Sequence, residues 1–368
     1  MRVLLHADPV AHRIPGGIGT YVMRLVDALL AGPHTPDLEL LVSRSAAALP
    51  ERWDALPLRR TRLPLRALYA AWNGLRLPPS GRGADVVHAT NLVLPPGGRG
   101  VVATVHDLNV VLYPELVPQP WRALYRRGLH LAVHSDAVLC TSTLATANAL
   151  RERYDVAPER LVLTPFGSGM TADAPRDDAA LDRLGVRRPY VLTVGTLEPR
   201  KNQVALVRAF AASPDLSGHQ LVLAGVAGWG AGDVRAAVAA SGCADRILIA
   251  ESQGPQALAA LYAGADVFAL PSRYEGFGLP LLEALGFGVP SVASTDPALV
   301  EVAGGAAHHV DADDVEGLAA ALQRLAGDDD ERVRLRQAGP ARAAEFSWDE
   351  SARRLLSLLT EVVGSKSP

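Results

Sequence analysis

Residues 271–290 read Pro-Ser-Arg-Tyr-Glu-Gly-Phe-Gly-Leu-Pro-Leu-Leu-Glu-Ala-Leu-Gly-Phe-Gly-Val-Pro, and the rest of the chain can be understood from this segment. An apolar strand is expected over 266–270, followed by a loop that carries Glu275 and becomes a helix near Gly278. Pro280 suits the first helical turn, where the N–H that proline lacks would have no partner. The next residues, 281–287, are apolar almost all round, which is typical of a buried helix.

Two carboxylates flank the start of this helix. Glu283 lies inside the apolar run, where a carboxylate is costly unless something binds it, and Glu275 lies in the loop before it. Between them, the backbone N–H groups of Phe277, Gly278 and Leu279 point out of a helix N-terminus, which favours anions. The set suits a ligand with both hydroxyl and phosphate groups. The alternative is an ordinary strand, loop and helix in which Glu283 pairs locally.

A second strand, loop and helix is expected at 190–202. The strand 190–194 leads into Gly195-Thr-Leu-Glu-Pro-Arg-Lys-Asn, and a helix follows from about Asn202. Of the 36 basic residues only Lys201 and Lys366 are lysines, which draws attention to Lys201. Arg200 and Lys201 beside a helix N-terminus suit a diphosphate leaving group. The alternative is a pair of exposed surface cations.

The N-terminal half offers two further candidate positions. A glycine-rich loop with Gly16 and Gly17 lies between a strand at 3–6 and a helix at 18–30. Glycines let a backbone approach a phosphate, although this loop is neither a Walker motif nor a full dinucleotide fingerprint and a simple tight turn stays open. His106 and Asp107 follow a strand at 100–105, and ligands bind at the carboxyl ends of parallel strands. A purely structural histidine is the alternative.

The pattern Glu-Gly-Phe-Gly-Leu-Pro, with a second glutamate eight positions after the first, resembles the retaining glycosyltransferases of family 4, in their mannosyltransferase-like group. The run from Gly195 to Asn202 is similar to the diphosphate-binding loop of that family, and the agreement extends over nearly the whole chain. The resemblance implies a GT-B fold and a nucleotide-diphosphate sugar as donor, with no cofactor and no metal.

The resemblance also implies a role for each candidate residue. Glu283 would hold the ribose hydroxyls, while Glu275 and His106 would contact the transferred sugar and Asp107 the acceptor. Arg200 and Lys201 would neutralise the departing diphosphate. The donor site would be completed by Gly16, Gly17, Thr196, Gly276, Phe277, Gly278 and Leu279. Many members have arginine where Thr196 stands, so the second phosphate contact is left open between Arg200 and Arg273.

The wider sequence predicts an α/β protein with two Rossmann-like parallel-sheet domains that face each other across a cleft. We expect the first over 1–172, joined by a C-terminal helix at 347–368, and the second over 173–346, with a polar linker at 171–188. The two cysteines lie in opposite halves, which argues against a disulfide framework. We expect a cytoplasmic protein, because the N-terminus does not read as a signal peptide and no 18-residue apolar window occurs.

Charge gives one further hypothesis. The net charge of −3 does not argue for nucleic acid. Residues 51–82, however, carry seven arginines against two acids, with tyrosine and tryptophan interleaved. Two interpretations stay open for this Arg-rich region: a solvated helix packed on the core, or peripheral contact with an anionic membrane at its inner face.

We therefore predict a retaining hexosyltransferase, with GDP-mannose as first choice of donor and a glycan, lipid-linked or small-molecule acceptor. The resemblance implies front-face transfer, in which the leaving phosphate takes the acceptor proton. Two alternatives remain, a GT-B sugar-nucleotide epimerase and a non-catalytic nucleotide-sugar-binding protein. A dinucleotide dehydrogenase ranks below both, because neither half carries the full fingerprint.

Overall fold

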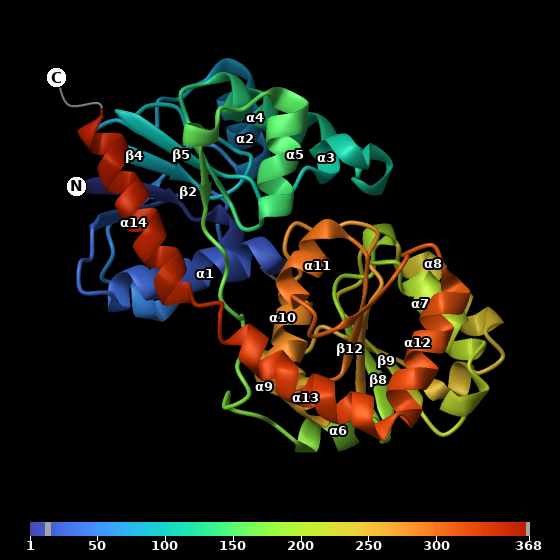
Figure 1. The fold of residues 1–368 in the computed structure, drawn as a ribbon. Coiled ribbons are helices and arrows are strands. Elements are labelled where there is room, and N and C mark those ends of the chain that lie inside the picture. Colours follow the sequence, from blue (N-terminus) through green and yellow to red (C-terminus); the bar gives the residue numbers. More distant parts are fainter. Residues whose placement is uncertain (12–15, 366–368) are drawn as a thin grey trace. The chain divides into compact units, whose positions relative to one another are not determined.

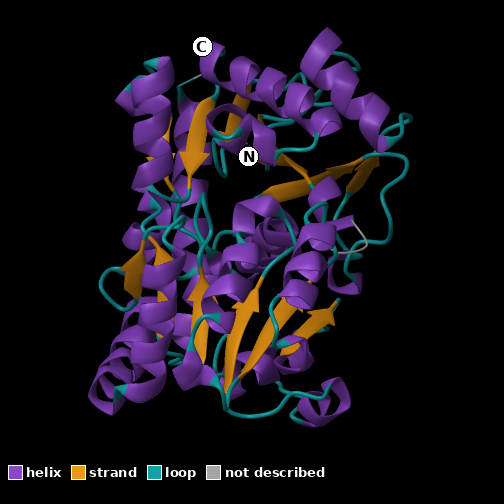
Figure 2. Ribbon diagram, turned by 90° about the vertical axis from the view of Figure 1, so that its right-hand side faces the viewer, coloured by secondary structure: helices purple, strands orange, loops and turns teal. Residues whose placement is uncertain are grey.

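The computed structural model describes residues 1–11 and 16–365, and the chain forms two α/β units. Unit 1 comprises Met1–Gly167 together with the chain from Ser347 onward, and unit 2 comprises Ser168–Phe346. The division lies close to the boundary expected at residue 172. Strands alternate with helices in both units and every strand pair is parallel, so the predicted α/β class with two parallel-sheet domains is confirmed (Figures 1 and 2).

Unit 1 is built on a seven-stranded sheet of order β3-β2-β1-β4-β5-β6-β7. Its strands are β1 (Arg2–His6), β2 (Asp37–Val42), β3 (Leu58–Arg60), β4 (Val86–Ala89), β5 (Gly100–Thr104), β6 (Val138–Thr141) and β7 (Leu161–Leu163). The helices are α1 (Gly16–Ala31), α2 (Leu65–Ala70), α3 (Asn109–Leu112), α4 (Gln119–His134), α5 (Leu144–Tyr154) and α14 (Trp348–Gly364). Strand order reverses between β1 and β4, which is where a ligand is expected in such a sheet.

Helix α14 ends the described chain but belongs to unit 1, where it contacts α1, β4 and β5 (Figure 1). Its apolar stripe is buried, and Gly100 has no room for a side chain because a Cβ there would lie 2.4 Å from Cγ1 of Val362. The start of α14 is fixed as well, since Trp348 stacks on Phe166 with ring centroids 5.6 Å apart. Helix α14 is therefore an integral part of unit 1.

Unit 2 is built on a six-stranded sheet of order β10-β9-β8-β11-β12-β13. Its strands are β8 (Tyr190–Val194), β9 (Gln220–Gly225), β10 (Ile247–Glu251), β11 (Val267–Leu270), β12 (Ser291–Ser294) and β13 (His308–Val310). The helices are α6 (Ala179–Leu184), α7 (Gln203–Ala211), α8 (Ala231–Ala240), α9 (Pro255–Gly264), α10 (Leu279–Gly286), α11 (Pro297–Ala303), α12 (Val315–Gly327) and α13 (Asp329–Ala343). One face of the sheet packs against α7, α8 and α12 in a single apolar core.

Two local expectations are wrong. The expected linker at 171–188 contains helix α6, which the polar composition hides. The Arg-rich region is no single helix: it forms a 3-10 turn (Glu51–Trp53), strand β3, helix α2 and a π-turn (Ala71–Leu75). Leu68, Tyr69 and Trp72 are buried there, which explains the interleaved aromatic residues as core.

Most arginines of this region are held by the protein itself. Arg52 pairs with Asp27, and Arg59 pairs with Glu39. Arg60 and Arg76 donate to backbone carbonyl oxygens, and Arg66 lies over the ring of Trp121. Ion pairs and hydrogen bonds thus account for four of the seven arginines, and the membrane contact expected from the sequence has to depend on Arg62, Arg66 and Arg82. No helix among residues 1–11 and 16–365 is long and apolar enough to cross a bilayer.

Candidate functional site

The two loops singled out in unit 2 follow neighbouring strands. Strands β8 and β11 pair in parallel, with Val191 opposite Val267, and the strand order reverses between them. The segment 195–201 follows β8 and the segment 271–278 follows β11, so both start at the same edge of the sheet. A reversal in strand order leaves a crevice at this edge, where open α/β sheets bind their ligands. Topology therefore brings together residues that are 75 positions apart.

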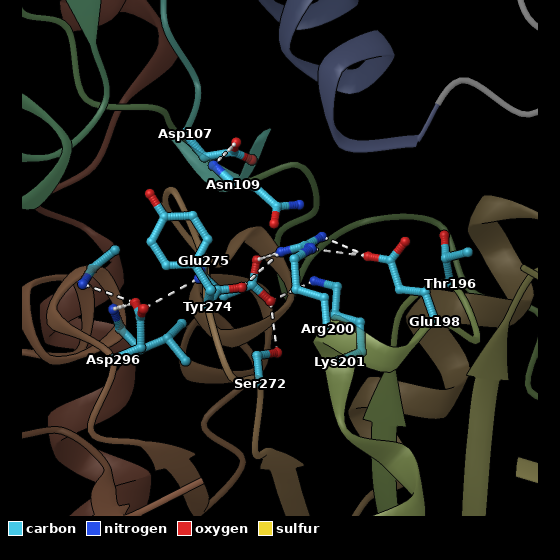
Figure 3. A network of polar contacts seen from close by, with 12 residues as sticks. Asp107, Asn109, Thr196, Glu198, Arg200, Lys201, Ser272, Tyr274, Glu275 and Asp296 are labelled. Atoms are coloured by element: carbon cyan, nitrogen blue, oxygen red, sulfur yellow. Dashed lines mark hydrogen bonds and ion pairs between the residues drawn. The ribbon is translucent and has the colours of Figure 1, made fainter. Parts of the chain in front are cut away.

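Glu275 is the centre of a buried polar network (Figure 3). Its Oε1 accepts from Nζ of Lys201 at 2.6 Å and from Oγ of Ser272 at 2.7 Å. Its Oε2 accepts from the guanidinium of Arg200 at 2.7 Å. Only 6% of Glu275 is exposed, and 8% of Lys201. The roles expected from the sequence place these charges on different parts of a ligand, and the structure shows that the charged groups also bind one another.

Two carboxyl groups of this network have opposite pKa shifts. Burial alone would raise the pKa of Glu275, but Arg200, Lys201 and the hydrogen bond from Ser272 bring it down to about 2. Burial raises the pKa of Asp296 to about 6; the N–H of Glu275 opposes this shift, and the negative charge of Glu275 adds to it. Glu275 is therefore a fixed anion at neutral pH, unsuited to donate a proton.

Arg200 and Lys201 differ in how many of their donors are used. The Arg200 guanidinium donates from Nε and NH2 to Glu198, at 3.0 and 2.8 Å, and from NH1 to Glu275 and to the carbonyl oxygen of Tyr274. Within the described part of the chain, the ammonium of Lys201 makes one side-chain hydrogen bond, to Glu275. An ammonium has three donors. Lys201 can therefore reach a further anion, whereas Arg200 mainly holds two carboxylates in place.

Close backbone packing fixes the loop of residues 195–198. A Cβ at Gly225 would lie 2.0 Å from the carbonyl oxygen of Gly195, and a Cβ at Gly228 would lie 2.6 Å from Cγ2 of Thr196. The carbonyl oxygen of Thr196 accepts from Nε2 of Gln203 at 2.9 Å. Gly225 at the end of β9 and Gly228 in the turn after it thus hold this loop in position, which gives this glycine-rich segment a structural role.

Helix α10 begins where the sequence predicts, with Gly278 as its N-cap and Pro280 in its first turn. Gly278 has φ +90°, a conformation that glycine adopts without strain, and it brings no side chain that would cap the helix. Glu283 is buried on this helix, and its Oε2 accepts from the hydroxyl of Tyr262 at 2.8 Å. The carboxylate in the apolar run therefore has a partner, as its burial requires.

His106 and Asp107 follow β5 in unit 1. Nε2 of His106 lies 2.7 Å from the carbonyl oxygen of Thr90, which can only accept, so this nitrogen carries the proton. Burial lowers the pKa of His106, although the Thr90 carbonyl acts in the opposite direction. The neutral ring therefore presents Nδ1 as a hydrogen-bond acceptor. Asp107 accepts from the backbone N–H of Asn109 at 2.9 Å and so fixes the turn after the strand (Figure 3).

Gly16 and Gly17 are the first two residues of α1, and both are exposed. A Cβ at either glycine would meet no atom within 4 Å, so nothing in the described chain requires glycine there for packing. Gly16 does have φ +57°. The preceding part of the expected loop, residues 12–15, lies outside the described residues.

The sequence predicts Arg200, Lys201 and Glu275 as members of one site. It does not predict the residues that hold them in place, which are Glu198, Ser272 and Asp296. Ser272 and Glu198 lie inside the two quoted motifs, so their position beside Glu275 and Arg200 was the available signal. Asp296 precedes a proline at a helix start, which is a recognisable cap pattern. Arg273, the other candidate for the second phosphate contact, pairs with Asp313 at 3.0 Å.

Across residues 1–11 and 16–365, no group of three or more histidine, cysteine, aspartate or glutamate side chains is placed to hold a metal ion. Cys140 and Cys243 are free and buried.

Comparison with known proteins agrees with this arrangement in both units. Residues 15–167 match the family Glycosyltransferase Family 4, and residues 182–342 match the family described as Glycosyl transferases group 1. The chain is 28% identical to the O-antigen chain mannosyltransferase B of Escherichia coli, over 97% of this chain and 99% of that protein. It is 32% identical to the D-inositol 3-phosphate glycosyltransferase of Rhodococcus opacus, over 70% of this chain and 61% of that protein.

Solved structures show the same fold at low sequence identity. Sucrose-phosphate synthase from Thermosynechococcus elongatus matches 99% of this chain and all of its own chain, with a TM-score of 0.80 and 22% identity. HepE of Anabaena, solved in complex with UDP and glucose, matches 98% of this chain and all of its own, with a TM-score of 0.75 and 18% identity. Both units are matched in order, the fold is GT-B, and the chain belongs to the family 4 glycosyltransferases.

Proposed function

We propose that the protein transfers a hexose from a nucleotide-diphosphate sugar to a glycan, lipid-linked or small-molecule acceptor, with retention of anomeric configuration. The observation that carries this proposal is the network of Lys201, Arg200 and Glu275 at the carboxyl ends of β8 and β11. Such a group offers fixed positive charge for a diphosphate and a fixed carboxylate for sugar hydroxyls. GDP-mannose is the first choice of donor, which the mannosyltransferase relative favours.

Lys201 is the residue that we assign to the leaving diphosphate. Its ammonium keeps donors beyond the one that Glu275 accepts. Arg200 adds positive charge beside it while its own N–H groups hold Glu198 and Glu275. In a site that is screened from water, preorganised charge of this kind stabilises the developing negative charge without reorganisation. In this proposal the two cations take the place of a divalent metal.

Glu275 is assigned to the transferred sugar. A carboxylate has about four lone-pair sites, and among the described residues three donors occupy them, two on Oε1 and one on Oε2. One acceptor site on Oε2 is left for a sugar hydroxyl. With its pKa at about 2 and two cations in contact, Glu275 is a poor nucleophile. This supports front-face transfer, in which the leaving phosphate takes the acceptor proton, over a double displacement.

The remaining assignments complete the donor and acceptor sites. Glu283 takes the ribose hydroxyls, and the backbone of Gly276, Phe277, Gly278 and Leu279 adds N–H groups. Thr196 in the loop after β8, and Gly16 and Gly17 at the start of α1, are assigned to the donor as well. His106 accepts from a hydroxyl of the sugar through Nδ1, and Asp107 serves the acceptor. We infer a cytoplasmic protein.

The test starts with binding, because a ligand that binds only the native state raises the melting temperature. Thermal shifts with GDP, UDP and dTDP identify the nucleotide. Release of that nucleoside diphosphate from its hexose donor is then measured with and without candidate acceptors. Conversion of the donor into an epimeric sugar nucleotide without an acceptor and without net release of nucleoside diphosphate would favour an epimerase. Nucleotide binding with neither release nor epimer formation under any condition would favour a binding protein.

Membrane contact is a separate proposal about unit 1. Arg62, Arg66 and Arg82 are exposed, with Arg66 lying over the ring of Trp121, and Leu75 and Leu77 are 74% and 56% exposed in the same region. Sedimentation with anionic phospholipid vesicles at low salt tests it, with neutral vesicles as control. Equal recovery in the supernatant with both vesicle types would refute it.

A further inference from the structure

We propose that Asp296 is a positioning residue of the donor site: it fixes the backbone at Glu275 while it caps helix α11. The proposal rests on the function proposed above for Glu275 and Lys201. It assigns a role to a residue that none of the motif patterns includes. Asp296 follows β12, the strand next to β11, so it approaches the Glu275 loop from a different strand than Lys201 does.

The two carboxylate oxygens of Asp296 serve two different segments (Figure 3). Oδ1 accepts from the backbone N–H groups of Ala298 and Leu299, at 3.0 and 3.3 Å, and so caps α11. Oδ2 accepts from the backbone N–H of Glu275 at 3.3 Å. Asp296 is only 8% exposed, and its own N–H donates to Oγ of Ser294. The side chain is therefore held in one orientation, and it links the Glu275 loop to the start of α11.

Helix α11 touches the same loop at a second point. A Cβ at Gly278 would lie 2.3 Å from Cδ2 of Leu299, so the first turn of α11 packs directly against the N-cap of α10. The loop from Glu275 to Gly278 is thus supported at one end by a hydrogen bond and at the other by packing. Both supports come from the first turn of the same short helix.

Capping alone does not explain an aspartate at this position. Serine or threonine caps a helix as well, and either would avoid a second carboxyl group beside the ionised Glu275. Among the described contacts, Oδ2 of Asp296 serves the N–H of Glu275 and no other group. A second carboxylate oxygen at this position places negative charge close to Glu275, which is unfavourable. The hydrogen bond from the Glu275 N–H to Oδ2 explains why the protein has an aspartate here and not a serine. A small displacement of that backbone would move the carboxylate that Lys201 and Arg200 contact.

Two substitutions separate the roles of the two oxygens. Asp296→Ser keeps a capping oxygen but is too short to reach the Glu275 N–H as well. Asp296→Asn keeps the length but offers an acceptor on one side only, so either the cap or the Glu275 bond is lost. The matched control is Asp314→Ser. Asp314 caps α12 in the same unit by accepting from Gly317 N–H at 2.8 Å, and among residues 1–11 and 16–365 it accepts no hydrogen bond from the Glu275 loop.

The first measurement needs no ligand. Hydrogen–deuterium exchange of the peptide that contains residues 271–279 should become faster in Asp296→Ser and Asp296→Asn and stay unchanged in Asp314→Ser. The second measurement is release of nucleoside diphosphate from GDP-mannose and UDP-glucose. Small misplacements in a catalytic site cost up to about 100-fold, and we expect kcat to fall about tenfold with little change in KM for the two Asp296 variants only. Melting temperatures show whether each variant is folded.

Failure of the role of Asp296 and failure of the proposed function give different results. Unchanged exchange in the 271–279 peptide of both Asp296 variants overturns the proposal, even where no donor is turned over. Equal losses of rate in Asp296→Ser and Asp314→Ser also overturn it, because they would show a general effect of lost capping. If Lys201→Met and Glu275→Gln retain full turnover, the proposed function fails instead, and this result is independent of the exchange measurement.

Discussion

The ion pair between Lys201 and Glu275 predicts that substitutions in this pair affect the stability of the protein and its activity differently. Lys201→Met removes the ammonium and keeps most of the apolar stem, so that Glu275 is left with Arg200 and Ser272. Loss of one partner of a fully buried pair costs about 3–5 kcal/mol, and hydrogen bonds to charged groups contribute about 1.5–3 kcal/mol. Because two donors remain at Glu275, we expect Lys201→Met to lower the free energy of unfolding by about 2 kcal/mol.

The double variant Lys201→Met/Glu275→Gln should recover most of that stability. A buried pair replaced on both sides by neutral groups of similar size is often close to neutral, and we expect a net loss of at most about 1 kcal/mol. Activity should not recover. Loss of one preorganised charge lowers kcat by about 100-fold or more, and the double variant should be at least as slow as Lys201→Met. Urea unfolding followed by circular dichroism and nucleoside diphosphate release under saturating donor give the two quantities.

A matched control tests whether burial is the cause. Arg235 and Glu251 form an exposed ion pair in unit 2, with 53% and 39% of their side chains exposed. Exposed pairs contribute about 0–1 kcal/mol, so Arg235→Met should change neither stability nor turnover much. Two results would refute the reasoning: turnover of Lys201→Met close to that of the wild type, or a double variant that regains turnover together with stability.

Three further predictions follow from the same contacts. The pKa of Asp296 is raised from 3.8 to about 6, so the contribution of Asp296 to the stability of the fold is complete below pH 3.8 and is lost as the pH rises through 6. The pKa of Glu275 is lowered from 4.5 to about 2, so the contribution of Glu275 to stability is present above pH 4.5 and is lost as the pH falls through 2. The urea midpoint of the wild type relative to Asp296→Asn should therefore fall between pH 4 and pH 7, and a flat difference would contradict the assignment. Glu283→Ala should weaken binding of the nucleotide about tenfold or more in calorimetry, since hydrogen bonds to charged groups contribute about 1.5–3 kcal/mol. Gly225→Ala should destabilise unit 2 by about 1–3 kcal/mol, because the new Cβ would lie 2.0 Å from a carbonyl oxygen, whereas Gly232→Ala meets no atom within 4 Å and should not lower the melting temperature.

The fold could be predicted from sequence because its parallel strands are short apolar runs between recognisable turns. Strand β8 lies at the residues expected, and α10 starts at Gly278 with Pro280 in its first turn. Two strands that were not predicted, β3 and β13, have compositions that give no apolar run. Strand β3 reads Leu-Arg-Arg and β13 reads His-His-Val, and each pairs at the edge of its sheet, where less apolar surface is buried.

Only part of the candidate site could be predicted, because its contacts join segments that are far apart in the sequence. Local motifs name the residues at strand ends, which is enough to propose Lys201 and Glu275 as partners of one ligand. They do not say that these two side chains bind each other, because that depends on β8 and β11 being neighbours. Asp296 comes from a third strand. Its role depends on a backbone N–H, and a backbone N–H has no sequence signature.

The return of α14 to unit 1 has a consequence for how the chain is made. Unit 2 is one continuous segment and can close as soon as residue 346 has been synthesised, whereas the surface of α1, β4 and β5 that α14 covers has to wait until residues 348–364 have been made. During this interval an apolar strip on the nascent first domain is open to water and to other chains, which is the state in which partly made proteins aggregate. Unit 1 therefore begins before unit 2 but is completed after it, and a truncated gene product that ends before residue 348 would keep this strip exposed permanently.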